Sequence, residues 1–283
     1  MDIGLCLSGG GAKGAAHIGV LKAFEEENIN VKWISGCSSG SIVASLYFAG
    51  YTPNQILDFF NIYGSYIKDY DRNLFFKFLK GFLFCNLQVK GLIKGNNLEN
   101  LMRKKLNKKG IRLIRDYNKK IAIPAVDIRK NKLIYFVNHD IPNDDAEYIK
   151  NVDAAMAVRA SCSFPGIFIP VYYKDKILVD GGVVENTPIS ILRKMGATKV
   201  IAITFAEDEE INKVNNFIDV LVESFETQSS EIKKIKTKDA DILITLKLPN
   251  VSLLDIEKSK IIANKGYYLI KNNIDKIKEL IES

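Results

Sequence analysis

The sequence predicts an α/β fold, in which a mostly parallel central sheet carries helices on both faces. Short apolar strands alternate with helix-length segments along most of the chain, a pattern typical of βαβ units. Glycine-rich turns end the first two strands where helices begin, as at the carboxyl edge of a parallel sheet. The chain has 283 residues, of which 47% are hydrophobic, so it can bury a substantial core.

The expected elements follow from apolar periodicity and from glycine or proline breaks. In chain order they are strand 3–7, helix 15–27, strand 31–35, helix 39–49, helix 53–60, helix 98–107, strands 120–127 and 133–137, helix 146–158, strand 176–180, helix 189–195 and strand 199–204. Residues 205–283 are expected to add a helix, a strand at 242–246 and a final helix at 254–280 to the same domain.

Residues 64–95 interrupt this alternation. Tyrosine and phenylalanine are interleaved there with lysine and arginine, a combination that suits a lipid interface. The segment is interpreted either as a lid or membrane-docking insert, or as a helical insert that packs its aromatic side chains into the core.

The segment Gly36-Cys37-Ser38-Ser39-Gly40 lies between an expected strand and an expected helix and fits G-x-S-x-G. In this context the pattern is typical of a nucleophile elbow, a sharp turn that presents the middle serine at a helix N-terminus. The helix dipole and free N–H groups there favour developing negative charge. Ser38 is the predicted nucleophile; the alternative is a turn that is merely rich in glycine and serine.

A second glycine cluster follows the first strand, where Gly9, Gly11 and Gly14 fit G-x-G-x-x-G. A dinucleotide site would need a carboxylate at the end of the second strand, and none stands there. A Walker-type loop would need lysine followed by serine or threonine after its last glycine, where two alanines stand. We therefore expect an oxyanion hole of backbone N–H groups. Lys13 is either an anion-stabilising charge or a solvated lysine.

A nucleophilic serine needs a base. His17 lies on the helix after the glycine-rich turn and is interpreted as a packing or capping residue, and His139 lies in a polar turn. Asp180 ends a short apolar strand against Gly181 and Gly182, where burial would raise its basicity and let it accept the Ser38 proton. The alternative is a plain Asp-Gly turn.

The motifs G-G-G-A-K-G, G-C-S-S-G and D-G-G, in this order and context, resemble the patatin-like phospholipase family. Further similarity runs through the segments 159–166, 169–171, 186–188 and 195–197, so that the resemblance covers about residues 3–204. The elbow departs from the family at Cys37 and Ser39, where members commonly carry threonine and alanine. Both changes are small, and Ser39 becomes a rival hydroxyl that ranks far behind Ser38.

The resemblance implies a three-layer α/β/α fold and a serine lipid acyl hydrolase of phospholipase A or esterase type. It implies a Ser38–Asp180 dyad, with Ser38 as nucleophile and Asp180 as general base, and an oxyanion hole from the N–H groups of Gly10 and Gly11 together with Gly9. The motif glycines are Gly14, Gly36, Gly40, Gly181 and Gly182. Residues 3–204 would form the catalytic domain and residues 205–283 an extension packed on it.

The net charge of +7 comes from lysines scattered along the chain, which indicates a solvated surface with a weak attraction to anionic membranes. No nucleic-acid module, membrane-spanning segment or signal peptide is recognisable. The four cysteines show no C-x-x-C pairing, as in a reducing compartment. We expect a cytoplasmic protein that contacts membrane surfaces transiently, with an acyl-ester lipid as substrate and neither metal nor organic cofactor. The oligomeric state is not indicated.

Three other functions are compatible with these residues. Acyl transfer to an acceptor other than water, or thioester hydrolysis, would use the same dyad and oxyanion hole. A catalytically silent lipid-binding protein is opposed by the intact Ser38, Asp180 and glycine clusters. Nucleotide binding through residues 9–14 is weakened by the missing ribose carboxylate.

Overall fold

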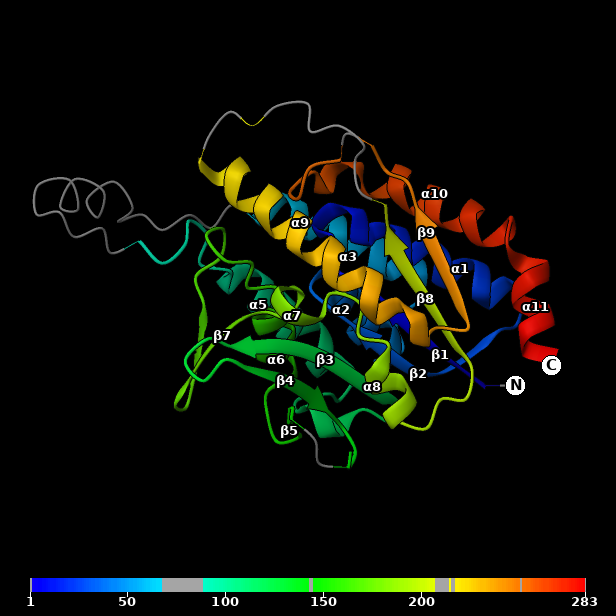
Figure 1. The fold of residues 1–283 in the computed structure, drawn as a ribbon, viewed down its shortest axis with the longest axis horizontal. Helices are drawn as coiled ribbons and strands as arrows, with labels where there is room; N and C mark the ends of the chain where they lie inside the picture. Colours follow the sequence, from blue (N-terminus) through cyan, green and yellow to red (C-terminus); the bar gives the residue numbers. More distant parts are fainter. Residues whose placement is uncertain are drawn as a thin grey trace, which may run out of the picture.

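The computed structural model describes residues 2–67, 89–142, 145–206, 214, 217–249 and 251–282. Within them, one sheet forms the centre of the molecule (Figure 1). Its strands are β1 (Asp2–Leu7), β2 (Asn30–Gly36), β3 (Lys120–Asp127), β4 (Lys132–Val137), β5 (Glu147–Ile149), β6 (Val171–Tyr173), β7 (Lys176–Asp180), β8 (Val200–Phe205) and β9 (Ile242–Leu246).

The strand order is β5-β4-β3-β2-β1-β8-β9. From β3 through β2, β1 and β8 to β9, every neighbouring pair is parallel, and β5 is parallel to β4. The exceptions are β4 and β7, which both run antiparallel to β3, and β6, which runs antiparallel to β7. The predicted α/β class with a mostly parallel sheet is confirmed.

Side chains alternate between the two faces of the sheet and so divide the core in two. On β1, Leu5 and Leu7 belong to the larger apolar cluster, whereas Cys6 between them belongs to the smaller one. On β2, Ile34 and Trp33 divide in the same way. Because both faces are apolar, both need helical cover.

Helices supply that cover on each face, which gives three layers (Figure 1). The helices are α1 (Ala16–Glu26), α2 (Ser39–Phe48), α3 (Pro53–Tyr66), α5 (Asn96–Lys108), α6 (Ala154–Ser161), α7 (Gly182–Glu185), α8 (Ser190–Lys194), α9 (Phe217–Lys236), α10 (Ser259–Lys271) and α11 (Ile274–Glu282). Helices α7, α8 and α9 lie in front of the sheet in this view, and α1, α3 and α10 lie behind it. A 3₁₀ turn, η1 (Gly11–Ala15), precedes α1.

Two of the expected helices were wrong. Residues 146–158 contain strand β5 and then α6, because Tyr148 pairs with Tyr135 of β4, with the two rings stacked 6.0 Å apart. Helix α6 begins only after Asp153, whose carboxylate accepts the Met156 N–H at 2.8 Å. Residues 254–280 form two helices, α10 and α11. Between them, the Asn273 side-chain amide donates to the Leu269 carbonyl oxygen, which favours the end of α10.

The remaining expected strands and helices are present within a few residues of their predicted bounds. Helix α3 continues six residues beyond the predicted end at Phe60, while β6 and α7 were not predicted. Most of the 64–95 insert, residues 68–88, lies outside the described residues, and so does Cys85. The lid and packed-insert interpretations therefore both remain predictions.

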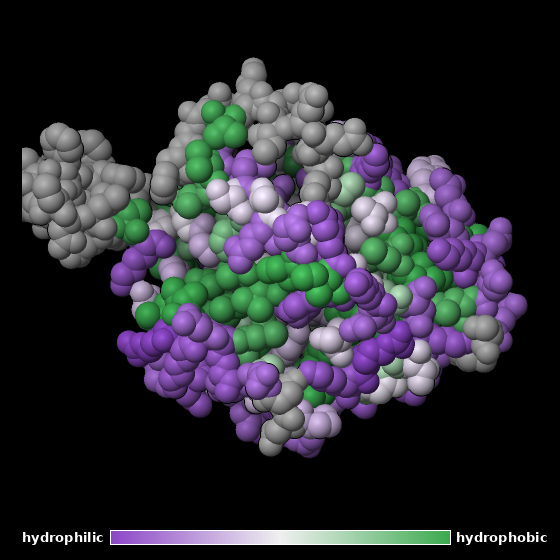
Figure 2. Space-filling view, in the orientation of Figure 1, coloured by the Kyte–Doolittle hydropathy of each residue, from purple (hydrophilic) through white to green (hydrophobic). Residues whose placement is uncertain are grey.

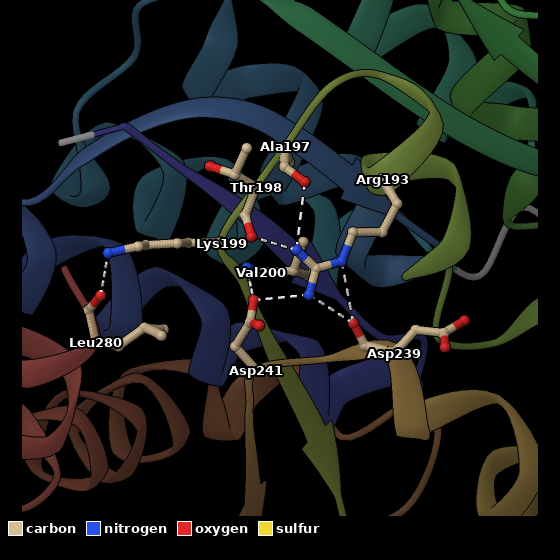
Figure 3. A network of polar contacts seen from close by, with 8 residues as sticks. All are labelled: Arg193, Ala197, Thr198, Lys199, Val200, Asp239, Asp241 and Leu280. Atoms are coloured by element: carbon tan, nitrogen blue, oxygen red, sulfur yellow. Dashed lines mark hydrogen bonds and ion pairs between the residues drawn. The ribbon is translucent and has the colours of Figure 1, made fainter. Parts of the chain in front are cut away.

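A polar network ties the C-terminal part of the chain to the sheet (Figure 3). The Arg193 guanidinium, on α8, donates to the carbonyl oxygens of Thr198 and Asp239 and pairs with the Asp241 carboxylate. Asp241 also accepts the N–H of Val200, the first residue of β8. The network lies where β8 begins, whereas the glycine-rich turns leave the opposite, carboxyl edge of the sheet.

Candidate active site

The segment 36–40 forms a sharp turn between β2 and α2. Ser38 has φ 49° and ψ −124°, a strained conformation for a residue with a side chain, which costs on the order of 1–3 kcal/mol. The surrounding structure holds it in place. The Ser38 N–H donates to the Ser161 hydroxyl at 3.1 Å, and the Ser38 carbonyl accepts the Ser41 hydroxyl at 2.6 Å.

Glycine is needed beside Ser38 because backbone passes close to backbone. A Cβ on Gly40 would lie 2.3 Å from the carbonyl oxygen of Leu7, the last residue of β1. A Cβ on Gly36 would lie 2.4 Å from the Gly40 carbonyl oxygen. The elbow therefore closes directly onto the end of β1, where the second glycine cluster begins.

The second cluster runs beside the elbow, as the parallel pairing of β1 and β2 predicts. A Cβ on Gly9 would lie 3.1 Å from the Cβ of Ser38, and one on Gly14 would meet the Ser39 hydroxyl. Gly11 has φ 55°, a left-handed conformation that favours glycine. A side chain there would also meet the Leu253 carbonyl oxygen at 2.4 Å.

The N–H groups of this turn differ in what they can bind. The Gly9 N–H donates to the carbonyl oxygen of Asn186 at 3.2 Å. Among the described residues, nothing accepts a hydrogen bond from the N–H of Gly10 or Gly11. The Gly9 donor is already used within the fold, so Gly10 and Gly11 are the stronger candidate donors, and the role expected of Gly9 stays a prediction.

Strand β3 brings Asp180 to the serine. The first part of β3 pairs with β2, Ser35 opposite Ala122, and its last part pairs with β7, Asp180 opposite Ala125. Strand β7 therefore takes the place beside β3 that β2 leaves when it turns into the elbow. Its last residue, Asp180, therefore lies against the elbow, where it contacts the Cys37 thiol.

The Asp180 carboxyl is only 2% exposed. Burial raises its pKa from 3.8 to about 6, against hydrogen bonds from the Gly182 N–H, the Ser38 hydroxyl and the Cys37 thiol, which lower it. Oδ1 accepts the Gly182 N–H at 2.8 Å and the Cys37 thiol at 3.6 Å. Oδ2 is buried and has no hydrogen-bond partner of standard geometry among the described residues.

The turn after Asp180 is packed on both sides. A Cβ on Gly181 would lie 2.6 Å from the Pro124 carbonyl oxygen of β3. Gly182 begins α7, which ends at Glu185, a 3% exposed carboxylate paired with Lys236 of α9. Helix α9 therefore holds the short helix whose first N–H orients the Asp180 carboxylate.

Sequence reasoning gave no role to two further groups. Ser161 binds the N–H of Ser38, and the nearby Ser163 carbonyl accepts the Asp180 N–H at 3.0 Å, so the end of α6 supports both sides of the site. The Asn186 side chain lies between Gly9 and Gly182, since a Cβ on either would approach its Oδ1 atom, to 2.3 and 3.1 Å. Ser161 and Ser163 lie in segment 159–166 and Asn186 in segment 186–188, both of which resemble the family. That resemblance is the sequence signal that could have identified them.

Three adjoining cavities lie at or beside Ser38. The apolar pocket is lined by Gly11, Ser38, Ser39, Ile42, Phe60, Tyr63, Ile67, Leu98, Cys162, Phe164, Phe168, Leu253, Leu254 and Ile256. The dyad cavity is lined by Gly10, Gly11, Ser38, Phe164, Asp180, Gly182, Asn186, Phe225, Glu226, Ser229 and Leu253. The polar pocket is lined by Gly9, Gly10, Lys13, Asn186, Thr204, Phe205, Ala206, Glu226, Ser229, Ser230 and Lys233. Ser38 lines the first two.

Neither histidine lines these cavities. His17 is fully buried on α1, its Nε2 lies 2.9 Å from the Ser8 carbonyl oxygen, and burial lowers its pKa to about 4. His139 lies beyond β4, near the Asn138 amide. The interpretation of His17 as a packing residue agrees with this placement.

Two other kinds of site are absent from the described part of the chain. No three His, Cys, Asp or Glu side chains there gather as a metal-ligand set. None of the helices in that part combines the length and the apolar character that crossing a bilayer requires.

Comparisons with known proteins agree with this geometry. A family model described as patatin-like phospholipase matches residues 5–193. YqhO of Bacillus subtilis (strain 168) is 32% identical over 263 residues, which cover 88% of this chain and 88% of that protein. Lysophospholipase NTE1 of Meyerozyma guilliermondii is 28% identical over 215 residues, 75% of this chain but 13% of that protein.

The fold also matches a solved structure, VipD from Legionella pneumophila, with a TM-score of 0.51 and 15% identity over 97% of this chain and 67% of that chain. At this identity the match speaks for the fold alone. The family model, in contrast, spans the elbow, the glycine-rich turn and the D-G-G turn. The chain therefore belongs to the patatin-like phospholipase family and is, in general terms, a lipid acyl hydrolase.

Proposed function

We propose that this chain hydrolyses acyl esters of membrane lipids through a Ser38–Asp180 dyad, with the N–H groups of Gly10 and Gly11 as the oxyanion hole. One observation carries the proposal: the strained serine, a buried carboxylate and two N–H groups that have no acceptor among the described residues line a single cavity. The NTE1 relative, named a lysophospholipase, supports a lipid substrate.

The first step is attack on the ester carbonyl. The Ser38 hydroxyl turns toward Oδ2 of Asp180 and gives up its proton to the ionised carboxylate as its oxygen bonds to the carbonyl carbon. The raised pKa of Asp180 makes it a stronger base than an exposed aspartate. The N–H groups of Gly10 and Gly11 stabilise the oxyanion, and losing one such donor typically costs about 100- to 1000-fold in rate.

The later steps use the same groups in reverse. Protonated Asp180 donates its proton to the leaving alcohol, and the acyl group remains on Ser38 as an ester. A water molecule then gives a proton to Asp180 and attacks the acyl-enzyme. Asp180 passes this proton to the Ser38 oxygen as the fatty acid leaves, which restores the serine hydroxyl and the carboxylate. The apolar pocket beside Ser38 would hold the acyl chain. We propose that the enzyme meets its substrate during transient contact with a membrane surface.

A fluorophosphonate probe tests the proposal, with ester turnover measured in parallel. We expect Ser38→Ala to lose labelling and to reduce turnover roughly 10⁴-fold or more, with its circular dichroism unchanged. Ser39→Ala, the matched control for the rival hydroxyl, keeps labelling, because the Ser39 hydroxyl lies against Gly14. Asp180→Asn keeps the fold and loses most turnover. A folded wild-type protein without labelling or turnover favours the silent lipid-binding function; transfer of acyl groups to added alcohols favours the acyltransferase.

A further inference from the structure

The polar pocket adjoins the site on the side away from the apolar pocket. Gly10, Asn186, Glu226 and Ser229 line both the polar pocket and the dyad cavity. No lining residue is shared between the polar and apolar pockets. The three cavities therefore follow one another in the order apolar pocket, dyad cavity, polar pocket. This is the order of acyl chain, ester and head group in a phospholipid.

The polar pocket brings together groups that bind an anion. Lys13, only 7% exposed, and Lys233 contribute two cations, and the Lys233 ammonium is anchored by donating to the Phe205 carbonyl oxygen at 3.1 Å. Thr204, Ser229 and Ser230 add hydroxyl groups. Charge-assisted hydrogen bonds from lysine and hydroxyl donors are a usual way to hold a phosphate.

Among the described residues that line the polar pocket, one is acidic. Glu226 is exposed on α9, one helical turn before Ser229 and Ser230, and lines both the polar pocket and the dyad cavity. Figure 2 shows that the surface along α9 is largely hydrophilic, beside an apolar band on the same face of the molecule. A carboxylate at this place repels a second negative charge and attracts a cation.

We propose that the polar pocket binds the head group of a zwitterionic phospholipid: Lys233, with Lys13 and the hydroxyls, holds the phosphate, and Glu226 faces the cationic amine. This inference rests on the proposed hydrolase function and names its substrate class. Helix α9, which lies outside the residues matched by the family model, thereby determines head-group specificity.

The first experiment compares kcat/KM for lysophosphatidylcholine with kcat/KM for p-nitrophenyl butyrate, which has no head group. We expect Lys233→Gln to lower the ratio of the two values by about 10-fold or more, because it removes a charged donor to the phosphate. Lys233→Arg keeps most of the ratio. The control is Lys234→Gln, since Lys234 pairs with Glu231 and does not line the pocket.

The second experiment compares lysophosphatidylcholine with lysophosphatidylglycerol, which is anionic. We expect Glu226→Gln to lower the preference for the choline lipid by roughly 2- to 5-fold, the size expected of an exposed ion pair. Glu223→Gln, on the same helix but outside the pocket, leaves the preference unchanged. An unchanged preference in Glu226→Gln overturns the assignment of the amine to this residue.

A binding measurement separates failure of this inference from failure of the proposed function. Glycerophosphocholine, a head group without acyl chains, is titrated into Ser38→Ala protein, and inorganic phosphate is titrated in parallel. Saturable binding of glycerophosphocholine that Lys233→Gln weakens supports the pocket even if no ester is turned over. No binding, or equal binding of inorganic phosphate, overturns the head-group assignment. If the wild type turns over both esters but Lys233→Gln leaves the ratio of their kcat/KM values unchanged, the head-group pocket is overturned and the hydrolase function is not.

Discussion

The backbone N–H of Gly9 donates to the backbone carbonyl oxygen of Asn186, at 3.2 Å. This single bond joins the glycine-rich turn after β1 to the segment after Asp180, two parts of the chain that are far apart in sequence. It holds the turn at Gly9, and the next two residues, Gly10 and Gly11, line the cavity that Ser38 and Asp180 also line. A backbone hydrogen bond thus holds the proposed oxyanion donors beside the segment that follows the proposed base.

The pH dependence of turnover should report Asp180. Burial raises the pKa of this carboxyl to about 6, and only its ionised form accepts the Ser38 proton. We expect kcat/KM on a neutral ester to be level above about pH 7 and to fall tenfold per pH unit well below pH 6. A profile that stays level down to about pH 4 contradicts the role of Asp180 as base.

Asp180 should also lower the stability of the folded protein at neutral pH. Its folded pKa of about 6 lies above the usual value of 3.8, so the folded state binds the proton more tightly than the unfolded state. This favours folding fully below about pH 4 and is lost as pH rises through 6, a difference of up to about 3 kcal/mol. We expect Asp180→Asn to melt at a higher temperature than the wild type at pH 8, with the advantage shrinking toward pH 4.

Gly11→Ala should damage the oxyanion turn. Gly11 has φ 55°, and a methyl group there meets the Leu253 carbonyl oxygen, so the turn must shift from its present position. We expect kcat to fall by about 100-fold, the cost of a misplaced oxyanion donor. Gly110→Ala is the matched control, since Gly110 also has a left-handed φ, 78°, but open space around it. The control loses about 1 kcal/mol of stability and no activity; equal kinetics in both variants contradict the prediction.

Arg193→Ala should separate stability from catalysis. The substitution removes hydrogen bonds to three carbonyl oxygens, those of Ala197, Thr198 and Asp239, and the ion pair with Asp241, which join α8 to the segments before β8 and β9. We expect the free energy of unfolding in a denaturant titration to fall by about 1–3 kcal/mol. Because the network lies at the edge of the sheet away from Ser38, kcat/KM per folded molecule stays at the wild-type value. A large loss of kcat/KM in the folded variant contradicts this.

The sequence was most informative where a local backbone constraint dictates the residue. Gly11 and Gly40 occupy positions that no other residue can fill without displacing backbone, so the two turns could be recognised and placed at neighbouring strand ends. The strand end at Asp180 could be recognised in the same way, because the next residue, Gly181, lies so close to the backbone of β3 that a side chain would not fit. The catalytic roles of Ser38 and Asp180 remain proposals.

Features that depend on distant parts of the chain were not predicted. Tyr148 lies in a strand because β4 offers a free edge and Tyr135 a stacking partner, neither of which local periodicity reveals. Ser161 supports Ser38 across 123 residues of sequence, and Gly9 loses its free N–H to a carbonyl that the sequence does not mark. Such contacts follow from the completed sheet.

Strand β3 pairs with both strands that lead to the proposed dyad, with Ala122 opposite Ser35 of β2 and Ala125 opposite Asp180 of β7. Three residues of extended chain, about 10 Å, therefore set how far apart the strands carrying nucleophile and base end. A change in the length of a loop between β3 and β7 leaves that spacing unchanged, because the pairing with β3 sets it. During refolding, the elbow and the glycine-rich turn can form early from neighbouring segments, but hydrolysis returns only when β7 has docked on β3, a late, long-range closure. A fragment that ends after β3 would lack both Asp180 and Ser161, whose hydroxyl accepts the Ser38 N–H.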